Sequence, residues 1–311
     1  MANRPLNLVW RRKALDSVLE TSFIRNVLLR NLKRPQRWIS LEDGEDLPMI
    51  DDMLIVSFGD PVEYFEAARA RGLKNIGFFQ LGDEIGKNTC QSYQHADYVL
   101  RHYYFADHLS SMTDGKSPEV LWVPNGWGRG IGPDDAARQL SFRDRRLMIF
   151  FSGFVRNEDR KIDEREEMLV ALREQRIPAM VSLTGGFGQG LGPSAFAAHM
   201  GNARFAAVPG GNSPETIRLY DALELGALPV VLDREWIHAK DGLAAIGEPP
   251  LVLLKSWQEA GEMLGPYLEG GDDAVLDKAD EQRLRLGEWW QAFKSHTAER
   301  VARVIDRSFA C

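Results

Sequence analysis

The stretch GNARFAAVPGGNSPETIRLYDALELGALPVVLD, residues 201–233, decides the fold class. Its order predicts a strand at residues 205–208, a glycine-containing loop, a helix that begins with Ser213 as N-cap, and a second strand at residues 229–232. Gly226 is suited to the end of that helix because glycine adopts the left-handed backbone conformation at low cost. A buried strand, a helix and another buried strand in this order are typical of a parallel α/β sheet.

The loop and the start of this helix predict a phosphate site. A helix N-terminus attracts anions, and glycines let a ligand approach the backbone closely. Four loop residues precede the helix: Gly210, Gly211, Asn212 and Ser213. Arg218 can donate a fork of charged hydrogen bonds to a diphosphate, and Asp221 can accept from ribose hydroxyls. The alternative is an Arg–Asp pair on a solvated helix face, which the flanking glycine loop and the Gly-x-x-Pro-Val-Val exit disfavour.

The same alternation of strand and helix recurs along most of the chain. Buried strands are predicted at residues 53–58, 75–80, 98–101, 120–123, 147–151, 179–183 and 205–208. They predict an α/β protein with two Rossmann-like lobes, residues 1–140 and 141–311. Apolar residues at helical spacing predict a long helix over residues 277–309, and residues 3–33 are expected to be mostly helical.

Ligands of such sheets bind in the crevice beyond the carboxyl ends of the strands. Ser152, Gly153 and Arg156 follow the predicted strand at residues 147–151, so we expect them to face a cleft between the lobes. Arg156 would offset negative charge on a departing nucleotide. Arg165, in the next helix, is a second candidate, although it can equally pair with a neighbouring glutamate.

Two carboxylates follow a strand of the first lobe. Asp83 and Glu84 lie in a glycine-bearing loop, where one of them could accept the proton of an acceptor hydroxyl. The sequence does not decide between them; Asp83 is preferred, and both can instead cap the next helix. The end of another strand supplies candidates for acceptor binding: Arg101, His102, Tyr103 and Tyr104. Their aromatic planes can stack on a sugar, although one of the tyrosines is expected to belong to the core.

Composition excludes several classes of function. A formal net charge of −7 argues against nucleic acid as a partner, since a phosphate-tracking surface needs clustered positive charge. The chain has two cysteines and six histidines, without a familiar zinc spacing, so no metal and no disulfide framework are expected. The glycines of residues 184–192 depart from the dinucleotide fingerprint, which leaves an NAD-dependent oxidoreductase as a weaker alternative.

The sequence has no apolar run long enough to span a bilayer and no signal-peptide core at its start. These features predict a cytoplasmic protein. Basic residues between positions 11 and 37 surround apolar ones, so peripheral association with the inner face of a membrane, or an acidic acceptor, is one interpretation. A solvated helix face is the other.

The motif Ser213-Pro214, Arg218-Leu219, Asp221-Ala222-Leu223 and Gly226-x-x-Pro229-Val230 resembles the exostosin family of glycosyltransferases, and most nearly its ribitol xylosyltransferase branch. Together with Leu81-Gly82-Asp83-Glu84 and the segments at residues 250–257 and 289–294, the resemblance covers roughly residues 75–309. It implies a GT-B fold, inversion at the anomeric carbon and a reaction without a metal.

These observations predict a glycosyltransferase that uses a UDP-sugar, with UDP-xylose as one donor, and needs no cofactor. The expected acceptor is a polysaccharide or a polyol phosphate of a surface glycan. A protein that binds nucleotide sugars without turnover is the main alternative.

Overall fold

The computed structural model describes residues 4–12, 20–42, 44–88, 90–110, 118–128, 130–131, 140–155, 164–186, 189–268 and 272–308. The chain divides into two compact units. Unit 1 consists of Met1–Asn125 together with Lys294–Cys311, and unit 2 of Gly126–Phe293. Unit 1 thus ends ahead of the boundary expected after residue 140, and it takes in the end of the chain.

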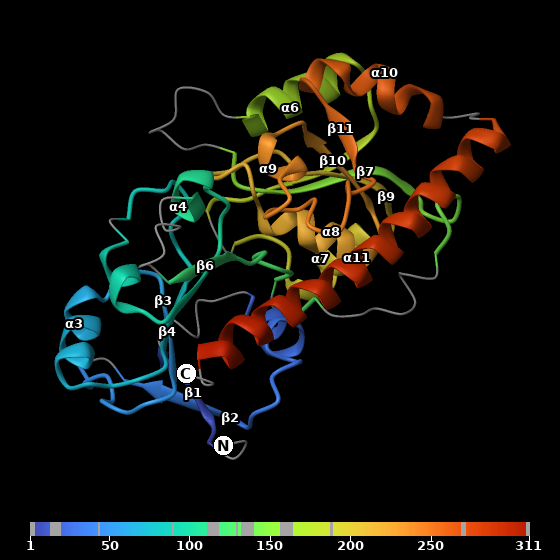
Figure 1. Ribbon diagram of the computed structural model, residues 1–311. Helices are drawn as coiled ribbons and strands as arrows, with labels where there is room; N and C mark the ends of the chain where they lie inside the picture. Colours follow the sequence, from blue (N-terminus) through green and yellow to red (C-terminus); the bar gives the residue numbers. More distant parts are fainter. Residues whose placement is uncertain are drawn as a thin grey trace. The chain divides into compact units, whose positions relative to one another are not determined.

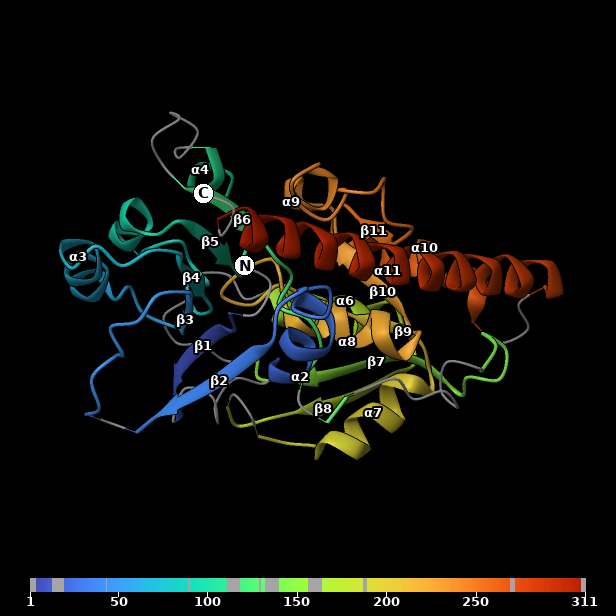
Figure 2. The ribbon, with the colours of Figure 1, turned by 60° about the horizontal axis from the view of Figure 1, so that its bottom comes forward.

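Unit 1 is built on a parallel sheet with the strand order β2-β1-β3-β4-β5-β6 (Figure 2). Its strands are β1 (Leu6–Arg11), β2 (Gln36–Leu41), β3 (Met53–Ser57), β4 (Ile76–Gln80), β5 (Tyr98–Arg101) and β6 (Glu119–Trp122). Its helices include α3 (Val62–Ala70) and α4 (Ala106–Ser110). All five residues of β4 are buried, as expected of a central parallel strand that is covered on both faces. The four strands predicted for this lobe are confirmed.

The start of the chain differs from the prediction. Residues 3–33 were expected to be mostly helical, but Leu6–Arg11 form β1, which pairs with both β2 and β3. Helical structure among the described residues of this segment includes α2 (Thr21–Phe23) and a π-helical turn at Ile24–Leu28. The apolar run of β1 is buried along five of its six residues, so strand pairing in the core outweighs local helix propensity.

Unit 2 contains a second parallel sheet with the order β11-β10-β9-β7-β8. Its strands are β7 (Leu147–Gly153), β8 (Ala179–Leu183), β9 (Ala203–Ala207), β10 (Leu228–Leu232) and β11 (Val252–Leu254). The helices are α6 (Glu164–Glu174), α7 (Pro193–Gly201), α8 (Ile217–Leu225), α9 (Glu235–His238), α10 (Ala260–Leu264) and most of α11 (Asp273–Ser308). Helices α6 and α10 contact each other, as do α7 and α8, and the two pairs lie on opposite sides of the sheet (Figure 1).

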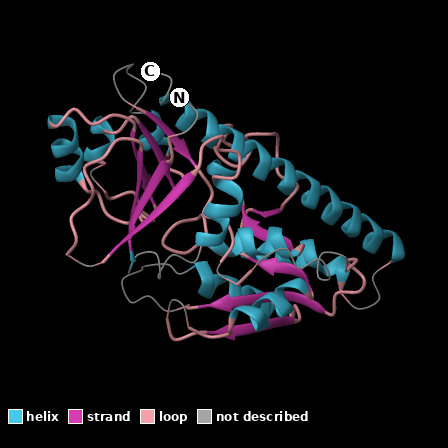
Figure 3. Cartoon of the chain, turned by 90° about the horizontal axis from the view of Figure 1, so that it is seen from below, coloured by secondary structure: helices cyan, strands magenta, loops and turns pink. Residues whose placement is uncertain are grey.

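The strand order creates a switch point in unit 2. From β7 the chain adds β8 on one side and then β9, β10 and β11 on the other. The strands are drawn in magenta in Figure 3. In doubly wound sheets a ligand crevice opens where the direction of winding reverses, here between the carboxyl ends of β7 and β9.

The strand, loop, helix and strand of residues 201–233 are confirmed as β9, α8 and β10, with a correction at the start of the helix. Thr216, with φ −129° and ψ 147°, is the N-cap, and α8 begins at Ile217. The hydroxyl of Ser213 instead accepts the N–H of Glu215 at 3.2 Å, within the turn that precedes the helix. Gly226 ends the helix with φ 72°, as predicted. Arg218 consequently lies in the first helical turn.

The predicted C-terminal helix is confirmed as α11, which extends over 36 residues. In unit 2 its Trp290 is buried, stacks with Tyr220 of α8 at a centroid distance of 5.9 Å, and donates its indole N–H to Glu224 at 2.8 Å. Among the described helices none combines the length and the apolar character that a bilayer span requires.

Candidate functional site

Arg218 is a buried cation at the switch point of unit 2. Only 8% of its surface is exposed, and its Nε donates to the carbonyl oxygen of Ser152 at the end of β7, at 3.1 Å. Its guanidinium carbon lies 4.7 Å from the centre of the Phe151 ring. Nη1 is buried and has no hydrogen-bond partner within the described residues. Burial, and then the charge of Arg165, lower the pKa of Arg218 to about 9, so an anion at this position would compensate its charge.

Arg165 supplies a second cation in the same place. It extends from the first turn of α6, donates through Nε to the carbonyl oxygen of Gly210 at 3.2 Å and through Nη1 to that of Phe154. The loops that follow β7 and β9 are therefore tied together by one guanidinium group. Two arginines near each other in this way repel unless a negative charge lies between or beside them.

Glycines allow both arginines to approach the backbone. A Cβ atom at Gly153 would lie 2.6 Å from Nη2 of Arg218, and one at Gly211 would lie 2.7 Å from Nη2 of Arg165. Side chains at these two positions would displace the guanidinium groups. The glycines of the predicted site thus have a steric role as well as the expected one of admitting a ligand.

Asp221 lies one turn beyond Arg218 on α8. Its Oδ1 accepts the N–H of Gly128 at 2.8 Å, and only 4% of its surface is exposed. Burial raises its pKa to about 7, against the opposing effects of the Gly128 hydrogen bond and the charge of Arg218. The alternative of a solvated Arg–Asp pair is wrong, because both side chains are buried. Gly128 lies in the segment between β6 and β7.

The structure brings most of the predicted donor residues together. Contacts within unit 2 connect Ser152, Gly153, Arg165, Gly210, Gly211 and Arg218, and Asn212 and Ser213 continue the same loop. Arg156 lies outside the described residues, so its role stays a prediction. The sequence missed Glu164, whose carboxylate accepts from the Trp257 indole at 3.3 Å and from Arg234 at 3.4 Å. The sequence could have indicated Glu164 by its position directly before Arg165, at the start of a predicted helix.

In unit 1 the two candidate bases have different surroundings. Oδ1 of Asp83 accepts the backbone N–H groups of Lys87 at 2.8 Å and Asn88 at 3.2 Å, and Oδ2 is paired with Arg101 at 3.2 Å. Asp83 is 4% exposed, so it orders its own loop from the inside rather than pointing into open space. Glu84 is half-buried and accepts the hydroxyl of Tyr103 at 3.2 Å. Of the two carboxylates, Glu84 is the more accessible.

The predicted acceptor residues also differ in how far they are buried. Arg101 and His102 are buried, with 0% and 2% of their surfaces exposed. Burial, and then Arg101, lower the pKa of His102 to about 3, so this imidazole stays neutral near pH 7. Tyr103 and Tyr104 are half-buried and remain within reach of a ligand. Tyr103 has φ 59°, an uncommon conformation for a residue other than glycine.

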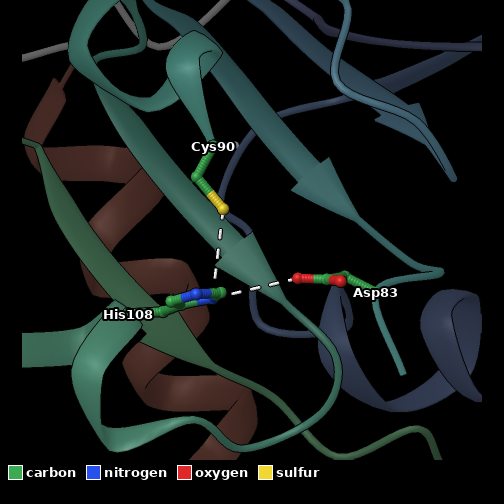
Figure 4. A group of neighbouring side chains, drawn as sticks. All are labelled: Asp83, Cys90 and His108. Carbon is green, nitrogen blue, oxygen red and sulfur yellow. Dashed lines mark hydrogen bonds and ion pairs between the residues drawn. The ribbon is translucent and has the colours of Figure 1, made fainter. Parts of the chain in front are cut away.

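Asp83, Cys90 and His108 form a cluster that the sequence did not indicate, since their spacing matches no familiar motif. Their potential ligand atoms lie within 4.8 Å of one another, and the side chains point toward a common centre (Figure 4). The guanidinium of Arg101, however, donates to Nδ1 of His108 and to Oδ2 of Asp83. Burial, and then Arg101, lower the pKa of His108. A fixed cation among these groups opposes a metal ion, so they fit a charge network better than a metal centre.

Several of the basic residues near the start of the chain have partners within unit 1. Arg34 pairs with Asp52 at 3.5 Å, Arg30 donates to Ser295 at 2.7 Å, and Arg25 lies 4.2 Å from the Trp38 ring centre. These contacts give the cations internal roles, and membrane association is not supported.

Two parallel α/β units, with an anion-attracting pair of arginines at the switch point of the second, define a protein of the GT-B class. Solved structures show the same fold. A trehalose-6-phosphate synthase from Burkholderia multivorans matches with a TM-score of 0.52 at 11% identity, covering 85% of this chain and 72% of that chain. A mutant O-GlcNAc transferase of Thermobaculum terrenum matches with a TM-score of 0.51 at 12% identity, over 98% and 68%. The predicted GT-B fold is confirmed.

Sequence comparison shows which glycosyltransferases this chain is similar to. Residues 192–310 match the family described as the RXYLT1 C-terminal domain. Ribitol-5-phosphate xylosyltransferase 1 of Danio rerio is 23% identical over 267 residues, which cover 78% of this chain and 57% of the relative. The Homo sapiens protein of the same name is 27% identical over 111 residues, covering 32% and 24%. The chain thus spans little more than half of the Danio rerio relative. The predicted resemblance to the ribitol xylosyltransferase branch is confirmed.

Proposed function

We propose that the chain is a glycosyltransferase that moves a sugar from a UDP-sugar, UDP-xylose among them, to a polysaccharide or polyol-phosphate acceptor in surface glycan synthesis. The GT-B fold and the matched C-terminal domain support the class. The observation that carries the proposal is the buried Arg218, whose Nη1 has no hydrogen-bond partner among the described residues, beside Arg165 and at the N-terminus of α8. A diphosphate is the ligand that uses all three features.

In this proposal unit 2 binds the donor. Nη1 of Arg218 and the first N–H groups of α8 hold the diphosphate, while Arg165 fixes the two loops around it. As the bond from the anomeric carbon to the diphosphate oxygen breaks, its electron pair remains on the nucleotide. The two cations stabilise that growing charge, which is the work that a metal ion performs in other transferases. We therefore propose a metal-independent reaction.

Unit 1 supplies the acceptor side. The acceptor hydroxyl attacks the anomeric carbon from the face opposite the nucleotide, which inverts the configuration, and a carboxylate takes its proton. We assign this role to Glu84 rather than to Asp83, which the sequence favours. Asp83 is buried and already accepts from Lys87, Asn88 and Arg101, whereas Glu84 is half-buried and is oriented by the Tyr103 hydroxyl.

Ligand-induced stabilisation tests the donor class. UDP at 100 times its dissociation constant is expected to add about 2.7 kcal/mol to the free energy of unfolding, whereas NAD⁺ adds nothing. The reverse result would favour the oxidoreductase. A screen of UDP-sugars for slow hydrolysis then separates an enzyme from a protein that only binds nucleotide sugars. Stabilisation by UDP without hydrolysis or transfer of any UDP-sugar would support the binding protein.

A further inference from the structure

Unit 1 has two exposed apolar side chains, one on the loop that carries Glu84 and one that packs against this loop at Gly82. Phe58 follows β3 and is 42% exposed, and Ile85 follows Glu84 directly and is 53% exposed. Few large hydrophobic side chains of the described residues are exposed to this extent, and the others lie in unit 2. Exposed apolar groups that adjoin a polar centre are typical of ligand sites rather than of ordinary surface.

The sheet register explains why these residues meet. Ser57 of β3 pairs with Gln80 of β4, and Gln80 pairs with Arg101 of β5. The ladder continues by one residue, because Leu81 donates to the Ser57 carbonyl at 2.9 Å and His102 to the Gln80 carbonyl at 3.0 Å. The loops that carry Phe58, Glu84 and Tyr103 therefore leave the sheet side by side at its carboxyl edge.

Gly82 fixes the position of the Phe58 ring. A Cβ atom at Gly82 would lie 2.6 Å from Cδ1 of Phe58, so the ring packs directly on the glycine backbone. The carbonyl of Gly82 in turn accepts the N–H of Glu84 at 3.0 Å. The Phe58 side chain is thus held against the loop that carries Glu84, while 42% of Phe58 stays exposed.

Tyr103 completes the arrangement from β5. Its left-handed backbone, φ 59°, is costly for a tyrosine and is held while its hydroxyl donates to Glu84 at 3.2 Å. Such strain is typical of ligand clamps. The edge therefore combines a flat apolar ring, an aliphatic side chain, a carboxylate and a phenol hydroxyl.

We propose that Phe58 and Ile85 form a platform for the ring of an acceptor sugar, whose C–H face lies on Phe58 while one hydroxyl reaches Glu84. A pyranose presents an apolar face and a hydroxyl-bearing edge, and so matches both parts of this surface. An open-chain polyol phosphate has no such face. The inference rests on the proposed function. Of the two acceptor classes named there, it favours the polysaccharide over the polyol phosphate.

The test measures binding of free acceptor probes to the full chain by ligand-observed NMR titration. The probes are the methyl glycopyranosides of xylose, glucose and galactose, with ribitol 5-phosphate as the comparison. We expect at least one glycoside to bind, Phe58→Ala to weaken it about tenfold, and Phe58→Tyr, which keeps the ring, to stay within about twofold of wild type. Leu284→Ala, which removes an aliphatic side chain that is 52% exposed on α11, is the control and is expected to change nothing.

Binding of ribitol 5-phosphate without any glycoside, or no glycoside binding at all, would overturn the platform. Equal affinities of wild type and Phe58→Ala would do the same. UDP affinity, measured on the same samples, separates this failure from that of the proposed function. If UDP binds while the acceptor results fail, only the platform is lost; if UDP does not bind wild type, the proposed function falls and the platform with it.

Discussion

Replacing Arg218 by alanine tests the donor site most directly. The substitution removes a buried guanidinium whose Nη1 has no partner within the described residues and whose Nε binds the Ser152 carbonyl. A hydrogen bond to a charged partner contributes about 1.5–3 kcal/mol. UDP affinity is therefore expected to fall roughly 10- to 150-fold, since about 1.4 kcal/mol corresponds to a factor of ten. Arg218→Lys keeps a positive charge without the planar fork, so its UDP affinity is expected to lie between those of wild type and Arg218→Ala.

Isothermal titration calorimetry with UDP at pH 7.5 provides the measurement, with thermal unfolding as the check that each variant is folded. Arg204→Ala is the matched control. Arg204 is a partly buried arginine of β9 whose Nη1 donates to the Tyr267 carbonyl at 3.3 Å, and no role in donor binding is assigned to it. A folded Arg218→Ala variant with UDP affinity within about twofold of wild type would refute the diphosphate assignment. Equal losses in both variants would point to net charge instead.

Three further outcomes are expected. The pKa of Asp221 is raised from 3.8 to about 7 in the folded protein, so between these pH values the unfolded state loses the Asp221 proton while the folded state keeps it. The free energy of unfolding of the wild type is therefore expected to decline from about pH 4 to pH 7. In chemical denaturation Asp221→Asn should lack this decline, and parallel pH profiles of the two proteins would contradict the burial argument. Glu84→Gln is expected to lower turnover by about 10²–10⁴ with little change in UDP affinity, and a larger loss in a fully stable Asp83→Asn variant would return the base to Asp83. Transfer is expected to survive EDTA, and the cluster of Asp83, Cys90 and His108 to bind no Zn²⁺ in a competition assay; activity that is lost to EDTA and restored by manganese would overturn the metal-independent reaction.

The second half of the fold could be predicted because its signals are local. The apolar strand, the glycine loop and Gly226 each act through their own backbone conformation, so their order alone defined β9, α8 and β10. The start of α8 was placed too early because Ser213 and Pro214 suit a helix start, but they form the preceding turn. Local capping rules cannot separate a turn from the first turn of a helix.

The start of the chain could not be predicted for a different reason. Leu6–Arg11 become a strand only because β2 and β3, from later in the chain, pair with them on both sides. Asp221 shows the same dependence on distant residues, since Gly128 binds it from far away in the sequence. The burial of Asp83 likewise depends on distant residues, since its carboxylate pairs with Arg101 of the neighbouring strand.

The chain passes between its units twice. Unit 2 is therefore one continuous segment inserted into unit 1, and unit 1 is made of two segments. In unit 1, Ser295 and Arg307 of the terminal stretch contact Arg30 and Glu119, at 2.7 Å and 3.7 Å. During synthesis, therefore, unit 2 has all of its residues before unit 1 does, although unit 1 begins first. A chain truncated after residue 293 would contain every residue of unit 2, while unit 1 would lack the helical turns that contact Arg30 and Glu119.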